Sequence, residues 1–153
     1  MAATVRLVPF EGLEARALYE ILRLRAEVFV VEQRSIYVDP DGRDLDALHL
    51  SLERDGRLVA YARIFLPDTA NGEARFGRVI VAPSVRGQHL GEAAVAIALE
   101  LLAVLAPGAP VAIAAQAYLV GWYGRFGFVA RSAEYLEDDI PHVDMIRESL
   151  LAY

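Results

Sequence analysis

The residues with the most evident chemistry are at positions 86–91, where Arg-Gly-Gln-His-Leu-Gly joins a β-branched run to a long apolar segment. The run at 79–81 is typical of a buried strand, and the apolar residues between 90 and 105 recur at helical spacing. A helix that starts directly after a glycine turn leaves several backbone N–H groups without partners, with the positive end of the helix dipole behind them. The spacing therefore predicts an anion-binding site, of the kind that holds phosphate groups.

Two common phosphate loops do not fit this sequence. A Walker loop requires Gly-Lys-Ser/Thr, and the chain has no lysine, while a dinucleotide fingerprint requires G-x-G-x-x-G in the first βαβ unit. Glycine at a strand-to-helix turn also has purely steric uses, so the loop alone leaves open whether a cofactor binds there.

Residues 86–91 resemble the Q/R-x-x-G-x-G/A loop of the GNAT acetyltransferases, in which successive amides hold the pyrophosphate of acetyl-coenzyme A. His89 stands where that pattern has its middle glycine. We expect the backbone of His89 to be helical, and its side chain to point away from the phosphates or toward them as a partial cation.

Three more segments resemble the same family. Residues 116–128 match its N-x-x-A-x-x-F-Y-x-x-x-G-F motif, with Gln116 in place of the asparagine. Residues 23–33, with the string Val-Phe-Val-Val-Glu-Gln, are similar to the ElaA-like branch, and so are residues 135–142, except that Asp139 stands where a glycine is expected. The resemblance extends over nearly the whole chain, which is therefore identified as a member of that family.

The resemblance implies an α/β fold of mixed α+β type, with a central, mostly antiparallel mixed sheet flanked by helices. The order of elements expected from hydrophobic periodicity agrees with it. Strands are expected at 4–9 on an edge, at 49–53 and 58–65 as a hairpin, at 75–81, at 110–115, and at 128–131 with 142–147 as a terminal hairpin. Helices are expected at 11–31, 90–105 and 118–126, the first with Arg16 paired to Glu20 and Arg23 to Glu27 on its outer side.

The resemblance also implies the reaction. A primary amine, of a small molecule or of a protein N-terminus, would attack the thioester of acetyl-coenzyme A directly, so that the coenzyme is a co-substrate. The residues that would hold it lie on the strand end, the glycine loop and the 116–128 motif: Ile80 and Val81 for the pantetheine arm and thioester, Gly87, His89, Gly91 and Glu92 for the pyrophosphate with Arg86 beside it, and Gln88, Gln116 and Tyr123.

Such an enzyme has to take a proton from the amine, stabilise an oxyanion and protonate the leaving thiolate. Tyr123 lies at the position of the family's tyrosine, four residues before Gly127, and is our candidate for the general acid. The alternative is that Tyr123 belongs to a purely structural aromatic core, and the agreement with the glycine loop favours the catalytic role. No single base stands out, because a water relay is equally admissible and the candidates are several: Glu32, His49, Glu73 and His142.

Composition narrows the class of protein. With 153 residues the chain is expected to form a single domain over 1–153, and the absence of cysteine excludes disulfides, cysteine nucleophiles and thiolate metal sites. A net charge of −6 argues against nucleic acid as a partner, and all 15 basic residues are arginine, so no lysine acts as a nucleophile. The apolar share of 56% suggests a homodimer, because surplus apolar surface has to be covered.

Residues 101–124 contain no charged side chain and are long enough to span a bilayer. Pro107, Gly108 and Pro110 interrupt them, which favours a helix end, a turn and a buried strand over a membrane span. The N-terminus lacks the layout of a signal peptide, so we expect a cytoplasmic protein without membrane contact.

The loop 34–48 carries four aspartates around a Pro-Asp-Gly turn: Asp39, Asp41, Asp44 and Asp46. A calcium loop does not fit, because Gly42 falls two places early and Leu50 stands at the closing glutamate. We therefore expect a solvated turn and no metal site. An acidic wall of this kind would attract a cationic, amine-bearing acceptor.

Two rival functions stay open. A non-catalytic acyl-coenzyme A binding or regulatory module would bind the coenzyme without releasing thiol when an amine is added. The Leu-Arg-x-x-Val-Phe string at 24–29 also resembles acyl-homoserine-lactone synthases, which share the fold and use a lipid-loaded carrier protein. This second rival ranks lower, because a carrier protein is itself acidic and would need a basic docking face.

Overall fold

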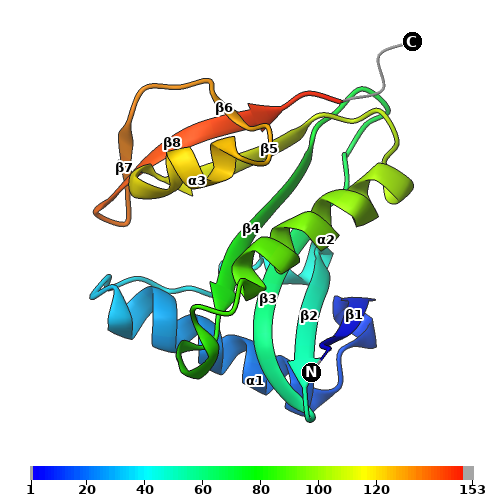
Figure 1. The fold of residues 1–153 in the computed structure, drawn as a ribbon, viewed down its shortest axis with the longest axis vertical. Coiled ribbons are helices and arrows are strands. Elements are labelled where there is room, and N and C mark those ends of the chain that lie inside the picture. Colours follow the sequence, from blue (N-terminus) through cyan, green and yellow to red (C-terminus); the bar gives the residue numbers. More distant parts are fainter. Residues whose placement is uncertain (1, 150–153) are drawn as a thin grey trace.

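The computed structural model describes residues 2–149, and within them eight strands form one mixed sheet. The strand order is β1-β2-β3-β4-β5-β8-β6, with β7 paired to β8 (Figure 1). The strands are β1 (Thr4–Pro9), β2 (Leu48–Arg54), β3 (Arg57–Phe65), β4 (Ala74–Val81), β5 (Val111–Gln116), β6 (Val129–Ala130), β7 (Tyr135–Glu137) and β8 (Ile140–Arg147). The helices are α1 (Ala15–Arg25), α2 (Leu90–Leu105), α3 (Val120–Gly124) and the π-helix η2 (Ala26–Glu32), with 3₁₀ turns η1 (Phe10–Gly12), η3 (Arg43–Asp46), η4 (Pro83–Val85) and η5 (Ala117–Leu119).

The sheet confirms the expected fold class. Its paired strands are antiparallel except β4 and β5, which are parallel. The expected hairpin forms from β2 and β3, and its turn contains Asp55 and Gly56 at φ values of 52° and 74°, as a two-residue turn between twisted strands requires. The strands expected as a terminal hairpin pair with each other as β6 and β8, but the chain between them forms β7, so the hairpin itself is β7–β8.

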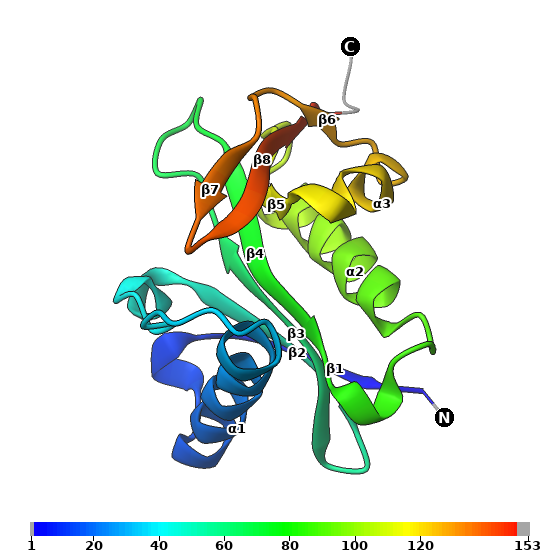
Figure 2. The same cartoon turned by 90° about the vertical axis from the view of Figure 1, so that its left-hand side faces the viewer.

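Two helices cover opposite faces of the sheet, α1 on one and α2 on the other (Figure 2). The alternation of side chains along β3 divides them between the two helices. Ala60 and Ala62 belong to the core cluster that contains α2, whereas Tyr61 packs with Ile21 and Leu24 of α1. The sheet is therefore buried on both sides along its middle strands.

The first helix differs from the single α-helix expected at 11–31. The α-helical backbone starts at Ala15 and changes at Ala26 into the seven-residue π-helix η2. Backbone bonds five residues apart continue past its end, as from Gln33 N to Val28 O (3.2 Å). Such widened turns often occur at functional sites. Neither of the ion pairs expected on the outer side of this helix is among the ion pairs within residues 2–149.

The fourth strand carries a bulge where it faces β3. Arg63 pairs with Gly77 and Tyr61 with Ile80, so β4 has one residue more than β3 in this interval. Arg78 lies within it at a φ of 52°, in the left-handed region that few non-glycine residues adopt. A bulge bends its strand.

Strands β4 and β5 pair only at their first residues, Ala74 with Val111 and Arg75 with Ala112. Beyond this seam the two strands separate, and Figure 1 shows them running apart from their common end. In the described part of the chain each of them then has one edge without a partner strand. The sheet is thus split at its middle.

The apolar stretch at 101–124 contains the expected interruption, since α2 ends at Leu105 and β5 begins at Val111. No helix within residues 2–149 combines the length and the apolarity of a bilayer span.

Candidate active site

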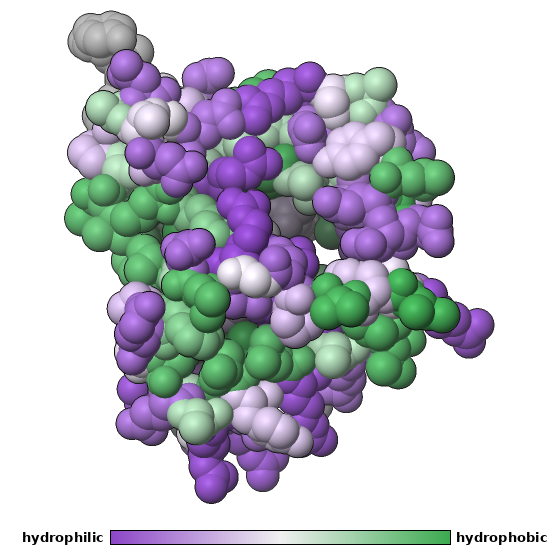
Figure 3. All heavy atoms as spheres, turned by 180° about the vertical axis from the view of Figure 1, so that it is seen from behind, coloured by the Kyte–Doolittle hydropathy of each residue, from purple (hydrophilic) through white to green (hydrophobic). Residues whose placement is uncertain are grey.

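A cleft of about 830 Å³ occupies the gap between the separated parts of β4 and β5. The π-helix η2 borders it on one side and the β7–β8 turn on the other, and Figure 3 shows it from behind as a hollow bordered by both hydrophilic and hydrophobic residues. The sequence-predicted residues that line it are Glu32, Ile80, Val81, Arg86, Gly91, Gln116, Tyr123 and His142. The remaining loop residues, Gly87, Gln88, His89 and Glu92, lie between Arg86 and the first turn of α2.

Strand β4 presents backbone polar groups to the cleft at alternate residues. Ala82 N donates to Val59 O (2.9 Å), and Ile80 is the ladder partner of Tyr61, so the backbone groups of Ala82 and Ile80 face β3. By the alternation of a strand, the N–H and C=O of Val81 point the other way, into the cleft. Val81 therefore has the geometry expected for holding the pantetheine arm. Ile80 also lines the cleft, although its backbone groups face β3.

The loop after β4 leads into the N-terminus of α2. Ala93 N donates to His89 O (3.1 Å), so the hydrogen bonds of the helix begin there. The amides of Leu90, Gly91 and Glu92 precede that bond and have no partner within the helix. Together with the dipole of the 16-residue helix they attract an anion.

His89 does not have the helical backbone that we expected for a residue in place of glycine. Its φ and ψ of 59° and 27° lie in the left-handed region, and nearby Gly87 has a φ of 81°. The loop thus keeps the conformation that a glycine would give it, at a backbone cost of about 1–2 kcal/mol. The His89 side chain is 85% exposed, with Nδ1 3.6 Å from the Glu92 carboxylate.

A carboxylate already lies at this end of the helix. The hydrogen bond from its own backbone N–H holds the pKa of Glu92 below its usual value. The same carboxylate accepts hydrogen bonds from Trp122 Nε1 (3.3 Å) and Arg125 Nη2 (3.4 Å). The Glu92 amide is therefore occupied by its own side chain, which has to turn away when another anion binds.

Arg86 and Glu32 form an ion pair of 2.9 Å that connects the glycine loop with η2, each with 44% of its side chain exposed. Glu32, a candidate base, is thus paired with the arginine expected beside the pyrophosphate. Gln88 Oε1 accepts a hydrogen bond from Arg54 Nη1 (2.5 Å), which fixes the loop to the β2–β3 hairpin. An anion that binds Arg86 has to compete with Glu32.

Tyr123 borders the cleft and is at the same time part of the core, with 7% of its surface exposed. Its ring packs edge-on against Trp122 (4.8 Å between ring centroids) and Phe128 (5.9 Å). Burial raises the pKa of Tyr123, so its hydroxyl keeps its proton at neutral pH, as a general acid must. Aromatic packing and a catalytic hydroxyl are therefore compatible at this residue.

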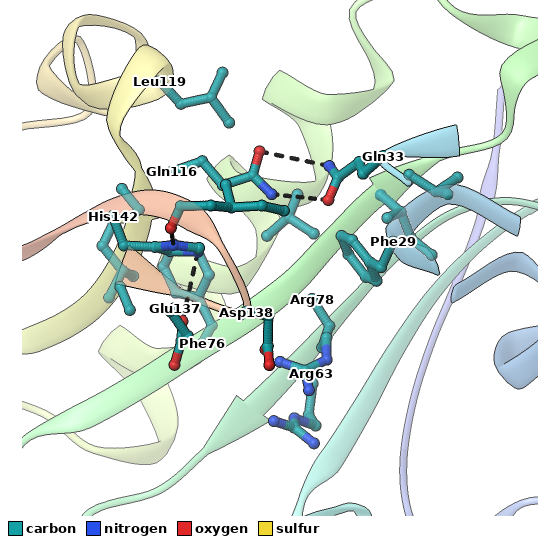
Figure 4. Close-up of a pocket in the computed structure, with 18 of the residues that line it drawn as sticks. Phe29, Gln33, Arg63, Phe76, Arg78, Gln116, Leu119, Glu137, Asp138 and His142 are labelled. Atoms are coloured by element: carbon teal, nitrogen blue, oxygen red, sulfur yellow. Dashed lines mark hydrogen bonds and ion pairs between the residues drawn. The ribbon is translucent and has the colours of Figure 1, made fainter. Parts of the chain in front are cut away.

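His142 lies on β8 directly opposite Gln116 of β5, so both side chains leave the same face of the sheet. Its Nδ1 donates to the Ile140 carbonyl oxygen (2.7 Å), and its Nε2 is 3.4 Å from a Glu137 carboxylate oxygen (Figure 4). A carbonyl oxygen only accepts, so Nδ1 carries a proton and Nε2 is the nitrogen free to exchange one. The Glu137 carboxylate thus lies on the Nε2 side of the ring.

Two contacts join the chain at the end of η2 to the far side of the cleft. The side-chain amides of Gln116 and Gln33 exchange hydrogen bonds of 3.1 and 3.4 Å across the cleft (Figure 4). Ser35 Oγ donates to the Asp138 carbonyl oxygen (2.9 Å) and ties the chain after η2 to the β7–β8 turn. Gln33 and Ser35 thus take part in shaping the site, although their residue types alone gave no reason to single them out.

Two of the candidate bases lie elsewhere. His49 is 1% exposed, and both ring nitrogens are engaged, Nδ1 with the Tyr61 hydroxyl (2.7 Å) and Nε2 with the Asp44 carbonyl oxygen (2.9 Å). It belongs to the core and does not line the cleft, which corrects its assignment as a catalytic base. Glu73 also lies outside the cleft, where both of its carboxylate oxygens bind Arg131.

The aspartates of the loop 34–48 are not a solvated acidic turn, because Asp39 and Asp44 are buried (3% and 7% exposed). Three aspartates meet three arginines in what we call the arginine–aspartate network: Arg25 with Asp39 (2.7 Å) and Asp44 (2.6 Å), Arg63 with Asp41 (2.8 Å) and Asp44 (3.1 Å), and Arg78 with Asp39 (2.8 Å). The network pairs three of the loop's four aspartates with arginines. It removes the acidic wall from which a cationic acceptor was expected.

Arg25 is the most deeply buried member of the network, at 0% exposed. It lies four residues after Ile21 and three before Val28, both of which are buried. A charged residue at the spacing of a buried helical face has to meet a buried counter-charge. That spacing signals that Arg25 needs a buried counter-charge, although it does not identify the aspartates that supply it.

Comparisons with known proteins agree with this geometry. The family model for the acetyltransferase (GNAT) domain matches residues 26–149. Protein ElaA of Escherichia coli (strain K12) is 42% identical over 142 residues, which cover 92% of this chain and 93% of ElaA. The crystal structure of an acyl-CoA N-acyltransferase from Pseudomonas aeruginosa has a TM-score of 0.90 at 43% identity, covering 95% of this chain and 99% of that chain. A coenzyme-A-dependent acyl-homoserine lactone synthase, BjaI, shares the fold with a TM-score of 0.76 at 18% identity, covering 95% of this chain and 83% of that chain.

Proposed function

Because the chain belongs to the GNAT acetyltransferase family, we propose that it transfers the acetyl group of acetyl-coenzyme A to a primary amine, of a small molecule or of a protein N-terminus. Membership of the family makes it an acyltransferase that uses an acyl-coenzyme A. The observation that supports the finer proposal is the lining of the cleft. It joins the N-terminus of α2 and the open edge of β4 to Tyr123 and His142.

In this proposal the coenzyme is held by the loop and by β4. The free amides at the start of α2 and the guanidinium group of Arg86 bind the pyrophosphate. The N–H and C=O of Val81 bond to an amide of the pantetheine arm, much as an added strand bonds to a sheet edge. The thioester then lies near Tyr123.

The proposed reaction needs two proton transfers at named atoms. His142 takes a proton from the ammonium group onto Nε2, and the freed amine attacks the carbonyl carbon of the thioester. As the carbon–sulfur bond breaks, the Tyr123 hydroxyl gives its proton to the sulfur. The second proton of the amine, lost as the amide forms, restores the tyrosine hydroxyl directly or through water.

Replacing His142 tests its role as the base. His142→Gln should lower kcat/KM at neutral pH by about 10²-fold, the lower range for loss of a general base. The deficit should shrink at a pH above the pKa of the amine, where the acceptor needs no base. Glu32→Gln is the comparison, because Glu32 is the other candidate base that lines the cleft. A deficit that does not change with pH, or a larger loss in Glu32→Gln, would remove His142 from this role.

Thermal unfolding of the full chain with acetyl-coenzyme A tests the function as a whole, with ATP and NAD as controls. A ligand at about a hundred times its dissociation constant adds about 2.7 kcal/mol, which at this size raises Tm by roughly 5–10 °C. Arg86→Gln should reduce the shift, and Arg57→Gln, at an exposed arginine outside the cleft, should leave it unchanged.

Amines are then added and free thiol is measured. Amine-dependent release of thiol supports the acetyltransferase. A coenzyme-specific shift without any release would indicate the binding module instead, and no shift would overturn the proposed coenzyme site.

A further inference from the structure

Three arginines surround Phe65 where β4 begins, at the opposite end of β4 from the glycine loop. The guanidinium carbons of Arg43 and Arg63 lie 4.4 and 5.1 Å from the centroid of the Phe65 ring. Arg75 is the ladder partner of Phe65, so its side chain leaves the same face of the sheet. All four residues line the cleft. We call Arg43, Arg63 and Arg75 the Phe65 cluster.

Among residues 2–149, Arg43 of the Phe65 cluster has no ion-pair partner and Arg75 has only a long contact with a carboxylate that it shares with Arg131. Arg63 belongs to the arginine–aspartate network, although its buried Nε has no hydrogen-bond partner. Arg43 makes no ion pair with any residue between 2 and 149. Arg75 approaches Glu73 only to 4.0 Å, and both oxygens of that carboxylate bind Arg131. At this end of the cleft the Nε of Arg63 and the guanidinium groups of Arg43 and Arg75 are therefore available to bind an anion.

The opposite wall of the cleft carries negative charge. Glu137 and Asp138 of the β7–β8 turn line the cleft beside His142. Figure 4 shows these two carboxylates at the same end of the pocket as the Arg63 guanidinium group. Within residues 2–149 the Asp138 carboxylate has no ion-pair partner, and that of Glu137 contacts His142 at 3.4 Å. One wall thus attracts an ammonium group and the other an anion.

We infer that the acceptor is zwitterionic, an amine that also carries a carboxylate, as α-amino acids do; this rests on the proposed acyltransferase function. The ammonium group lies against Glu137 and His142, where it loses its proton. The carboxylate lies against Arg43 and Arg75, because guanidinium groups bind carboxylates through parallel N–H donors. A polyamine would instead bring a second positive charge up to the Phe65 cluster, which Coulomb repulsion opposes.

Acceptors that share one apolar body and differ in the carboxylate test this inference. Phe29 and Phe76 also line the cleft, so an acceptor with an aromatic side chain suits it. The acceptors to compare are L-phenylalanine, L-phenylalaninamide and phenethylamine, with spermidine as the cationic alternative. Turnover is followed by release of free thiol from acetyl-coenzyme A. We expect kcat/KM for phenylalanine to exceed that for the amide and for phenethylamine by at least about tenfold, the effect of losing a hydrogen bond to a charged group.

Variants identify the residues responsible. In Arg43→Gln and Arg75→Gln the ratio of kcat/KM between phenylalanine and phenethylamine should fall toward one. In Arg57→Gln, whose arginine lies at the β2–β3 turn outside the cleft, the ratio should stay as in the natural protein. A ratio of one or less in the natural protein, or spermidine as the best acceptor, would overturn the inference while leaving the acyltransferase intact.

A binding measurement separates this inference from the proposed function. N-acetyl-L-phenylalanine and N-acetylphenethylamine are titrated by calorimetry into the protein that holds coenzyme A. Tighter binding of the carboxylate-bearing compound, lost in Arg43→Gln, supports the anion subsite even when no acceptor is turned over. Equal affinity for both compounds, or binding of neither, contradicts it.

Discussion

At the scale of single residues, the hydroxyl of Tyr123 can be removed without disturbing the ring that holds it. Tyr123→Phe keeps the edge-on contacts with Trp122 and Phe128 and removes the acid. We expect kcat to fall by about 10²–10⁴-fold, as for loss of a general acid, with coenzyme affinity unchanged. Steady-state kinetics and coenzyme titration measure the two effects. Tyr19→Phe, at an exposed tyrosine, is the control, and an unchanged kcat in Tyr123→Phe would remove the assignment.

The left-handed backbone of His89 gives a second prediction at this scale. His89→Gly relieves the strain but adds backbone freedom to the unfolded chain, so the free energy of unfolding should rise by about 1 kcal/mol or less. Coenzyme affinity should stay within about twofold, because affinity here depends on backbone amides. Urea unfolding and coenzyme titration check both effects. A clear loss of affinity would show that the imidazole itself contacts the coenzyme.

The sequence predicts single residues well where a motif or the alternation of a strand places them, and poorly where distant side chains meet. The resemblance implied that Val81, Arg86 and Tyr123 belong to one site, and all three line the same cleft. Their positions follow from the family motifs and from the alternation of side chains along β4. Asp139, expected as a glycine, has a φ of 62°, which aspartate tolerates because its short side chain is polar. The pairing of Arg25 with Asp44 could not be read from the sequence, because it depends on the path of a folded loop.

At the scale of elements, the arginine–aspartate network ties the loop 34–48 to α1, β3 and β4. Asp44→Asn leaves Arg25, at 0% exposed, without one of its two counter-charges. Removing one partner of a buried ion pair costs about 3–5 kcal/mol. We therefore expect the free energy of unfolding to fall by that amount in urea denaturation.

Asp46→Asn is the matched control for the network, because Asp46 is exposed in the same loop. An exposed substitution of this kind changes stability by about 0.5 kcal/mol or less. Equal stability of the two variants would mean that the network orders the loop without stabilising the fold.

The π-helix η2 shows why the type of an element is harder to predict than its existence. Apolar periodicity predicts a helix up to residue 31, and a helical segment does end at Glu32. The change from α to π hydrogen bonding depends on tertiary contacts, since Val28 packs against Tyr61 and Ile80 while Phe29 and Gln33 line the cleft. The apolar periodicity of the sequence does not show which of these residues pack in the core and which line the cleft.

At the scale of the whole molecule, stability should fall in two stages as the pH is lowered. Burial lowers the pKa of His49, so below about pH 6.5 the unfolded chain binds a proton that the folded protein does not, and the free energy of unfolding decreases. Burial alone would raise the pKa of Asp44, but its bonds to Arg25 hold it below the ordinary value. The stability that Asp44 supplies is complete above about pH 4 and is lost as the pH falls through the folded pKa.

Urea denaturation at a series of pH values resolves the two stages. In His49→Gln the free energy of unfolding should change less with pH in the first stage, and the second stage should be unchanged. His89→Gln, at a histidine that is 85% exposed, should change neither. A free energy of unfolding that stays constant from neutral pH down to about pH 5 would contradict the first stage.

The fold as a whole is the level that sequence predicts most fully. The order of strands and helices, the β2–β3 hairpin and the mixed sheet all follow from periodicity and from the resemblance. The split between β4 and β5 does not, because it results from a seam of two residue pairs and a bulge at Arg78. The single domain, the homodimer and the cytoplasmic location stay predictions.

The short pairing between β4 and β5 also decides which backbone amides of β4 exchange their hydrogen readily with solvent. The Ile80 amide faces β3 across a closed ladder, whereas the Val81 amide faces the cleft, so two neighbouring amides of one strand differ in protection. A ligand that lies along the open edge slows exchange only at the amides that face it. When a ligand is bound, deuterium uptake along β4 would then fall at every second residue.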